Sequence, residues 1–202
     1  MTVVDKVIVV WLIGSNASGK TTQAKMLHNS LGNKPKQILR GEDYKITTFG
    51  NIINLGEVND NQCTGADTLK GKVEFIKSFE VAMKLRPVII IVDAIMATGQ
   101  FIEFLNKPNV ILFPILLDYI TVNSNIDRIK QRRAKKKSVD PDSIQIDEKT
   151  YKNIEGKIRG FRSLFEKAKV VSKHHLKCIA TNPATSIHDE ILSSIEEIVL
   201  TT

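Results

Sequence analysis

The start of the chain holds the feature that most limits what this sequence can fold into. A continuous run of apolar, mostly β-branched residues, Val7 to Ile13, ends at Gly14. Such a run is typical of a strand that is buried on both faces of a sheet. After a short turn, apolar residues recur at spacings of three and four positions: Ala24, Leu27 and Leu31. This spacing predicts a helix over 20–31, so the chain begins with a buried strand, a glycine turn and a helix.

The turn between this strand and this helix matches the pattern G-x-x-x-x-G-K-[ST]. Its glycines allow backbone angles that other residues avoid, so successive N–H groups can point inward and bind the phosphates of a nucleotide. Lys20 can bridge the β- and γ-phosphates, and the Thr21 hydroxyl can bind Mg²⁺. The alternative is a glycine-rich turn beside a surface lysine. The expected nucleotide-binding residues are Gly14, Ser15, Asn16, Ala17, Ser18, Gly19, Lys20, Thr21 and Thr22.

Short apolar runs alternate with helical stripes along the rest of the chain, which predicts an α/β fold with a mostly parallel sheet flanked by helices. The length of 202 residues favours one domain. Pro114 is expected near a strand end or at a sheet edge, because proline cannot donate to a ladder. The expected further strands are two short ones within 44–55 and one each at 88–92, 110–117 and 177–180. Further helices are expected to start near Val122 and carry a basic run at 128–137, to span about 149–171, and to follow 183. Another is expected from near Leu69 to before Pro87, with Leu69, Val73, Ile76, Phe79 and Met83 on its core stripe.

The composition excludes several classes of protein. With 42% hydrophobic and 25% charged residues, the chain has the composition of an ordinary globular protein. Its longest apolar run is far shorter than the roughly 20 residues that span a bilayer. The start, MTVVDK, lacks the features of a secretion signal, so we expect a cytoplasmic location and no membrane partner. The net charge of +7 predicts a polyanionic partner, and Cys63 and Cys178 are expected to be reduced thiols.

Asp93 directly follows the expected strand at 88–92. The carboxyl ends of the strands face the bound ligand in doubly wound sheets, so we expect this carboxylate to point at the phosphates. In that position it can hold Mg²⁺ through water or accept the proton of an attacking hydroxyl group. The alternative is a carboxylate that caps the segment after the strand.

Basic residues are concentrated between 128 and 137, where seven of ten residues are Lys or Arg and none is acidic. Such a run is most often a solvated helix face. It also follows an apolar strand and precedes a turn-rich break, a position that resembles the lid of small P-loop kinases. Arginines in such a lid stabilise the charge of the transferring phosphoryl group and help to exclude water. The expected lid arginines are Arg128, Arg132 and Arg133, and Lys135, Lys136 and Lys137 are expected to contact a nucleic-acid backbone or solvent.

With these features in this order, nearly the whole chain resembles the nucleotide-kinase branch of the P-loop proteins, the group that contains thymidylate and adenylate kinases. The resemblance implies an acceptor-binding insertion over about 41–70 and a lid over about 128–148. It also implies catalytic roles for Lys20, Asp93 and the lid arginines, and a contact of Asn182 with the adenine ring. No D-R-Y/H-like acceptor sequence follows Asp93, and this departure argues against thymidylate kinase activity.

Four short segments, GSNASGKT, FGNIINLG, TGADTL and IVDAI, resemble those of bacteriophage kinases that phosphorylate 5-hydroxymethyluracil within DNA during thymine hypermodification. This resemblance implies ATP as the phosphate donor, the hydroxymethyl group of the base as the acceptor and double-stranded DNA as the carrier. It further implies that Thr64, Gly65 and Asp67 line the acceptor site, with Asp67 accepting a hydrogen bond. Alternatively, Asp67 or Thr68 caps the helix that begins near Leu69. Two other functions are compatible with the sequence: a free nucleoside or nucleoside monophosphate kinase, and a nucleic-acid-binding module switched by nucleotide.

Overall fold

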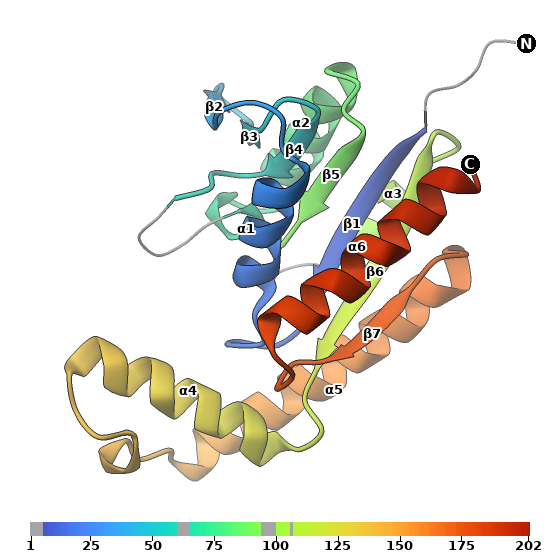
Figure 1. The fold of residues 1–202 in the computed structure, drawn as a ribbon. Coiled ribbons are helices and arrows are strands. Elements are labelled where there is room, and N and C mark those ends of the chain that lie inside the picture. The colour runs from blue at the N-terminus through green and yellow to red at the C-terminus, as the bar shows by residue number, and fades with distance from the viewer. Residues whose placement is uncertain (1–5, 60–64, 94–99, 106) are drawn as a thin grey trace, which may run out of the picture.

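A computed structural model describes residues 6–59, 65–93, 100–105 and 107–202, which form a seven-stranded sheet flanked by helices (Figure 1). The strands are β1 (Val7–Ile13), β2 (Gln37–Arg40), β3 (Lys45–Thr48), β4 (Ile52–Leu55), β5 (Ile89–Val92), β6 (Val110–Asp118) and β7 (Leu176–Ile179). The helices are α1 (Lys20–Leu31), α2 (Lys72–Lys84), α3 (Gln100–Leu105), α4 (Val122–Lys137), α5 (Glu148–Val171) and α6 (Ala184–Leu200), with short 3₁₀-helices η1 (Ala66–Thr68) and η2 (Pro141–Ser143). None of the helices in this described part of the chain has both the length and the apolar character that crossing a membrane requires.

The sheet is mostly parallel, as the alternation of strands and helices predicts. Its strand order is β2-β3-β4-β5-β1-β6-β7. The strands from β4 to β7 in that order are mutually parallel, whereas β3 is antiparallel to both of its neighbours. Every residue of the central strand β1 is buried, which accounts for its uninterrupted apolar sequence. The predicted α/β fold is therefore confirmed.

Two apolar clusters pack helices against the two faces of the sheet. On one face, Val9 and Trp11 of β1 lie in a cluster with buried residues of α2, α3 and α5. On the other face, Val10 and Leu12 lie in a cluster with buried residues of α1 and α6. The alternation of β1 side chains between the clusters follows from the two-residue period of a strand. The sheet is thus the middle layer of three.

Helix α4 lies outside these layers, beyond the carboxyl ends of the parallel strands (Figure 1). It packs on the first half of α5 through a third cluster of buried isoleucines: Ile126, Ile129, Ile154 and Ile158. Ala17, in the turn after β1, packs against the same cluster. The helix ends at Ser138, which has a left-handed backbone conformation, and η2 lies in the connection to α5. The element that carries the basic run therefore contacts the turn that follows β1.

Helix α2 ends before Pro87, as predicted, but it begins at Lys72 and not near Leu69, and its buried face differs from the predicted stripe. Phe79 is buried, whereas Val73 is 68% exposed. The buried residues of the helix are Glu74, Phe75, Ser78, Phe79 and Ala82. Leu69 is buried but lies in the turn before the helix, so its position does not define the helical face.

Pro114 lies in the middle of β6, an interior strand, so its predicted place at a strand end or sheet edge is wrong. The ladder between β6 and β7 begins only at Ile115, opposite Leu176. On the β7 side, the carbonyl of Asp118 accepts a hydrogen bond from the N–H of Ala180. Alternate residues of a strand direct their backbone groups to the same side, so Pro114 also faces β7. Pro114 therefore precedes the first residue of the ladder between β6 and β7, at a position where no N–H donor is needed.

Candidate active site

The turn between β1 and α1, here named the Gly14–Thr21 loop, lies where the parallel strands end. A Cβ atom at Gly14 would lie 2.8 Å from the carbonyl oxygen of Leu117 in β6, so a side chain does not fit there. Gly19 has φ 95° and ψ 7° and occupies the N-cap position of α1, a conformation that other residues rarely adopt. The first glycine of the motif is therefore required by packing and the second by backbone conformation.

Lys20, the first residue of α1, turns back into the Gly14–Thr21 loop. Its ammonium group donates hydrogen bonds to the carbonyl oxygens of Gly14 at 2.8 Å and Ser15 at 3.0 Å, and the residue is only 7% exposed. Burial lowers the pKa of Lys20 to about 8, while the negative charges of Asp67 and Asp93 act in the opposite direction. A surface lysine beside a turn, the alternative interpretation, does not describe this residue.

The loop side chains differ in exposure. Ser15 is buried and donates its hydroxyl to Oδ1 of Asn125 at 3.2 Å. The hydroxyl of Ser18 is also buried, but among the described residues it has no hydrogen-bond partner. A buried hydroxyl without a partner is costly, and an anion in the loop would provide the missing acceptor. Asn16, Thr21 and Thr22 are exposed.

Asp93 directly follows β5 and is 3% exposed. Its Oδ1 accepts hydrogen bonds from Nδ2 of Asn54 and from the N–H of Ala66, both at 3.3 Å. Burial raises the pKa of Asp93 to about 7, although these two hydrogen bonds act in the opposite direction. This carboxyl group can therefore take up or release a proton near neutral pH. The segment that Asp93 would cap in the alternative interpretation begins at residue 94, outside the described residues.

Residues 65–68 lie against the end of β5 and bring two predicted acceptor residues to Asp93. Gly65 has φ 66° and ψ −145°, and a Cβ atom at this position would overlap Oδ1 of Asp93. Asp67 is half-buried, and its negative charge raises the pKa of Asp93 in addition to the larger effect of burial. The same charge acts on Lys20. Thr64, the third predicted acceptor residue, lies outside the described residues.

The alternative role of Asp67 or Thr68 as a helix cap is wrong. Helix α2 begins at Lys72, and Gly71 occupies its N-cap position. Asp67 and Thr68 instead belong to the 3₁₀-helix η1, which precedes the helix and ends before Leu69. Neither residue therefore belongs to the N-terminus of α2.

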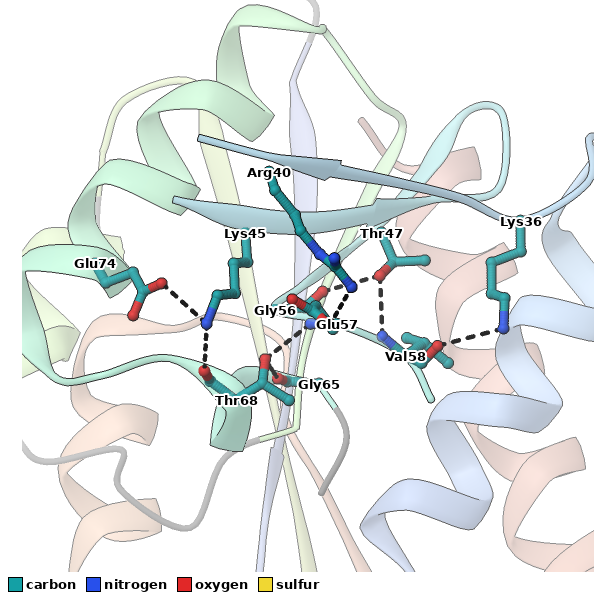
Figure 2. A network of polar contacts seen from close by, with 10 residues as sticks. All are labelled: Lys36, Arg40, Lys45, Thr47, Gly56, Glu57, Val58, Gly65, Thr68 and Glu74. Atoms are coloured by element: carbon teal, nitrogen blue, oxygen red, sulfur yellow. Dashed lines mark hydrogen bonds and ion pairs between the residues drawn. The ribbon is translucent and has the colours of Figure 1, made fainter. Parts of the chain in front are cut away.

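A network of polar contacts attaches residues 65–68 to the neighbouring strands (Figure 2). The hydroxyl of Thr68 donates to the carbonyl of Gly65 at 2.8 Å and accepts from the N–H of Glu57 at 2.9 Å. The ammonium group of Lys45 in β3 donates to the carbonyl of Thr68 at 3.2 Å and pairs with Glu74 of α2 at 3.4 Å. The segment is thus held from β3, from the residues after β4 and from α2.

Arg132 and Arg133 are both exposed on α4 but lie near different groups. Burial is the main cause of the low pKa of Lys20, and the positive charge of Arg132 lowers this pKa further. The pKa of Asp147 is lowered mainly by its hydrogen bonds with Thr150 and also by the charge of Arg133. The charge of Arg132 therefore acts on the Gly14–Thr21 loop, and the charge of Arg133 acts on the start of α5.

Arg128 lies near the strand end of β7. Its Nη2 donates to the carbonyl oxygen of Ala180, the first residue after β7, at 3.5 Å. Asn182, two residues further along the chain, is exposed and donates its N–H to the carbonyl of Ile179. Two predicted site residues, Arg128 and Asn182, are therefore brought together at one strand end.

Three buried polar residues beside the site have no role in the sequence predictions: Asn54, Tyr119 and Asn125. Oδ1 of Asn54 lies 3.1 Å from Nε2 of His28, which is itself buried in α1. The amide of Asn125 and the hydroxyl of Tyr119 donate to carbonyl groups of the Gly14–Thr21 loop at 2.7 Å and 2.5 Å. Asn54 lies within the segment FGNIINLG that carries the resemblance, but no role was predicted for it, and Tyr119 and Asn125 lie in no such segment.

Comparison of the chain with models of known protein families finds no match, and comparison with curated proteins finds none either. What the site does is therefore inferred from its own chemistry. It combines a buried ammonium group in a glycine loop with a buried carboxyl group and a second carboxylate nearby, and one arginine approaches from α4. Such a set of groups can bind an anion and exchange a proton. Among the described residues, no group of three or more His, Cys, Asp or Glu side chains is placed to bind a metal ion.

We expect the Gly65→Ala substitution to destabilise the protein more than Gly71→Ala. Both glycines have positive φ, 66° and 118°, and each substitution carries a backbone strain of about 1–3 kcal/mol. Only at position 65 would the new Cβ meet another group, Asp93, and such overpacking costs about 1–3 kcal/mol in addition. Urea denaturation of both variants measures the difference. Equal losses in the free energy of unfolding would show that Gly65 is needed for its backbone conformation alone.

Proposed function

We propose that the protein is an ATP-dependent phosphotransferase of the P-loop nucleotide-kinase type, which transfers the γ-phosphate of ATP to a hydroxyl group. The observation that carries this proposal is the buried ammonium group of Lys20, hydrogen-bonded to the carbonyls of Gly14 and Ser15 at the strand ends. Burial disfavours the charged form of this lysine, and nucleotide phosphates would supply negative charge that compensates for it. Asp93 adds a group that can take up a proton, which a site that only binds anions does not need.

The residues of the loop fit a nucleoside triphosphate with its metal ion. The hydroxyl of Ser18, which lacks an acceptor, would donate to a phosphate oxygen. The hydroxyl of Thr21 and the carboxylate of Asp93, the latter through water, would hold Mg²⁺, which when bound stabilises charge on the phosphoryl group. Arg128 and Asn182 lie together at the strand end that we assign to the adenine ring.

We assign the acceptor hydroxyl to the space beside Asp93 and Asp67. With a pKa of about 7, Asp93 is ionised in a large share of molecules at neutral pH, so it can accept the hydroxyl proton. The acceptor oxygen forms a bond to the γ-phosphorus, the bond from that phosphorus to the β–γ bridging oxygen breaks, and ADP leaves. Asp67 would hold the acceptor by a hydrogen bond, and Arg132 would stabilise the charge on the transferring group.

For the acceptor we propose the 5-hydroxymethyl group of 5-hydroxymethyluracil in duplex DNA. The support comes from the resemblance of four sequence segments, from the net charge of +7 and from the seven basic residues of 128–137 beside the site. Base extrusion costs a few kcal/mol when an enzyme reaches a base in a duplex. Lys135, Lys136 and Lys137, all exposed at the end of α4, would offset part of this cost by contacting backbone phosphates.

We predict that the protein transfers labelled phosphate from ATP to duplex DNA that contains 5-hydroxymethyluracil, and not to thymine DNA, which offers a methyl group in place of the hydroxyl. The assay incubates labelled ATP and Mg²⁺ with each duplex, with 5-hydroxymethyl-dUMP and with dTMP, and digestion to nucleosides locates the label. Lys20→Ala is the matched control and should lower transfer by at least about 10²-fold, because it removes the cation of the loop. Label on the mononucleotides alone would assign a nucleotide kinase, and ATP binding without transfer would assign a nucleotide-controlled switch.

We predict that Asp93→Asn lowers turnover by at least about 10²-fold, because an amide cannot accept a proton at neutral pH. The variant should fold normally. Burial raises the pKa of Asp93 from 3.8 to about 7, so ionisation costs stability as the pH rises through this window, and a neutral amide avoids the cost. Asp67→Asn serves as the comparison and should mainly raise KM for the acceptor. If Asp67→Asn shows the larger loss of turnover, the proton acceptor is Asp67 instead.

We predict that Arg132→Ala lowers turnover by at least about tenfold with little change in ATP affinity, because a lid arginine acts mainly in the transition state. Arg133→Ala should have an effect of less than about threefold, since its charge acts on Asp147 at the start of α5. Steady-state kinetics and ATP titration of both variants test this difference. Similar losses in the two variants would mean that α4 contributes a general positive field and no specific lid arginine.

A further inference from the structure

Four successive carbonyl groups of the Gly14–Thr21 loop each accept a hydrogen bond from a side chain. The acceptors are the carbonyls of Gly14, Ser15, Asn16 and Ala17. Lys20 binds the first two, Nδ2 of Asn125 donates to the third at 2.7 Å, and the hydroxyl of Tyr119 donates to the fourth at 2.5 Å. Two of these three donors, Asn125 and Tyr119, come from segments more than one hundred residues away in sequence.

The orientation of these carbonyls controls where the loop N–H groups point. In a planar trans peptide the C=O and the following N–H point in opposite directions. Donors that hold a row of carbonyls on one side of a loop therefore keep the intervening N–H groups directed to the other side. A row of inward N–H groups is what makes a loop concave toward an anion. Asn125 and Tyr119, which bind two of these carbonyls, can thus act on the anion site without touching the anion.

Asn125 is well suited to this role because its amide has one possible orientation. The residue is fully buried in α4. Its Oδ1 accepts from the hydroxyl of Ser15 at 3.2 Å while its Nδ2 donates to the carbonyl of Asn16. Exchanging the oxygen and nitrogen of the amide would place an acceptor against a carbonyl. The side chain therefore contacts the loop at two neighbouring residues and attaches it to α4.

Tyr119 contacts the loop from the strand side. It follows β6 directly, and only 1% of the residue is exposed. Burial is the main cause that raises the pKa of Tyr119, so its hydroxyl keeps the proton that it donates to Ala17. Ala17 has φ 63°, an unfavourable conformation for alanine, and a hydrogen bond to its carbonyl compensates for part of that cost.

We propose that Asn125 and Tyr119 are positioning residues that hold the Gly14–Thr21 loop in the form that binds nucleotide phosphates, without contacting the phosphates. This inference rests on the proposed function, because it takes the anion to be the triphosphate of ATP. It adds that nucleotide affinity depends on the attachment of α4 to the loop. The basic helix is then part of the phosphate site before any acceptor binds.

The test uses two uncharged substitutions, each with a matched control on an exposed residue of the same type. Asn125→Leu removes the amide and keeps the branched shape of the side chain, and Asn123→Leu is its control on the same helix. Tyr119→Phe removes one hydroxyl, and Tyr151→Phe is its control. Titration calorimetry with ATP, tripolyphosphate and adenosine separates binding of the phosphates from binding of the base. Amide hydrogen exchange of residues 15–19 in the ligand-free protein reports on the loop itself.

We expect Asn125→Leu to weaken the binding of ATP and tripolyphosphate by at least about tenfold and Tyr119→Phe by about three- to tenfold, the range for a lost buried hydrogen bond. Binding of adenosine should stay the same. Exchange of the loop amides in the ligand-free protein should accelerate in both variants, because the loop then samples other orientations. Both control variants should match the unsubstituted protein in all these measurements.

The outcomes separate this inference from the proposed function. If Lys20→Ala loses ATP binding while Asn125→Leu and Tyr119→Phe keep full affinity and normal exchange, the positioning role is wrong and the proposed function stands. If the unsubstituted protein binds neither ATP nor tripolyphosphate, the proposed function fails and the positioning role for phosphates fails with it. If Asn125→Leu does not fold, Tyr119→Phe decides alone: unchanged affinity and exchange refute the role, and weaker phosphate binding with faster exchange supports it.

Discussion

The parallel pairing of β1 with β5 and β6 is the constraint on which the candidate site depends. In this register Trp11 lies opposite Val92, so Asp93 emerges beside the last residues of β1, where the Gly14–Thr21 loop begins. On the other side, Ile13 pairs with Leu116, and Tyr119 leaves β6 next to the same loop. A shift of one residue in either pairing would move these side chains to the opposite face of the sheet. The pairing of the buried, apolar strand β1 thus determines where Asp93 and Tyr119 lie, although neither residue belongs to β1.

Burial of the charged groups gives the site its chemical character. Desolvation lowers the pKa of Lys20 to about 8 and raises that of Asp93 to about 7. Both pKa values are therefore much closer to neutral pH than those of the same side chains on the surface. The ammonium group of Lys20 is hydrogen-bonded to two backbone carbonyls, and the carboxyl group of Asp93 accepts hydrogen bonds from Asn54 and Ala66. Such partly compensated groups are typical of functional sites. Under the proposed function, bound phosphate supplies the negative charge that favours the protonated lysine.

Local sequence patterns predicted the elements that carry their own signal. The strand, glycine turn and helix over residues 7–31 could be predicted because burial, backbone angles and helical period each leave a local trace. Strand β2 escaped prediction since its residues are half-buried or exposed and do not alternate clearly. Asn125 escaped for a different reason: its partner Asn16 lies 109 positions away, and nothing local distinguishes it from Asn123. Contacts between distant segments need the register of the sheet, which periodicity does not contain.

Helix α4 combines packing on α5 with contacts to the candidate site. Its isoleucines pack on α5, its buried Asn125 binds the Gly14–Thr21 loop, and the charge of its exposed Arg132 acts on Lys20. The three lysines lie in its last turn, where their positive charges interact favourably with the negative end of the helix dipole. Under the proposed function, one helix therefore holds the phosphate-binding loop through Asn125, stabilises the transferring group through Arg132 and contacts the DNA backbone at its end. Because a helix is rigid over this length, binding of the nucleotide restricts where the DNA backbone can bind, and binding of the DNA backbone restricts the position of the nucleotide.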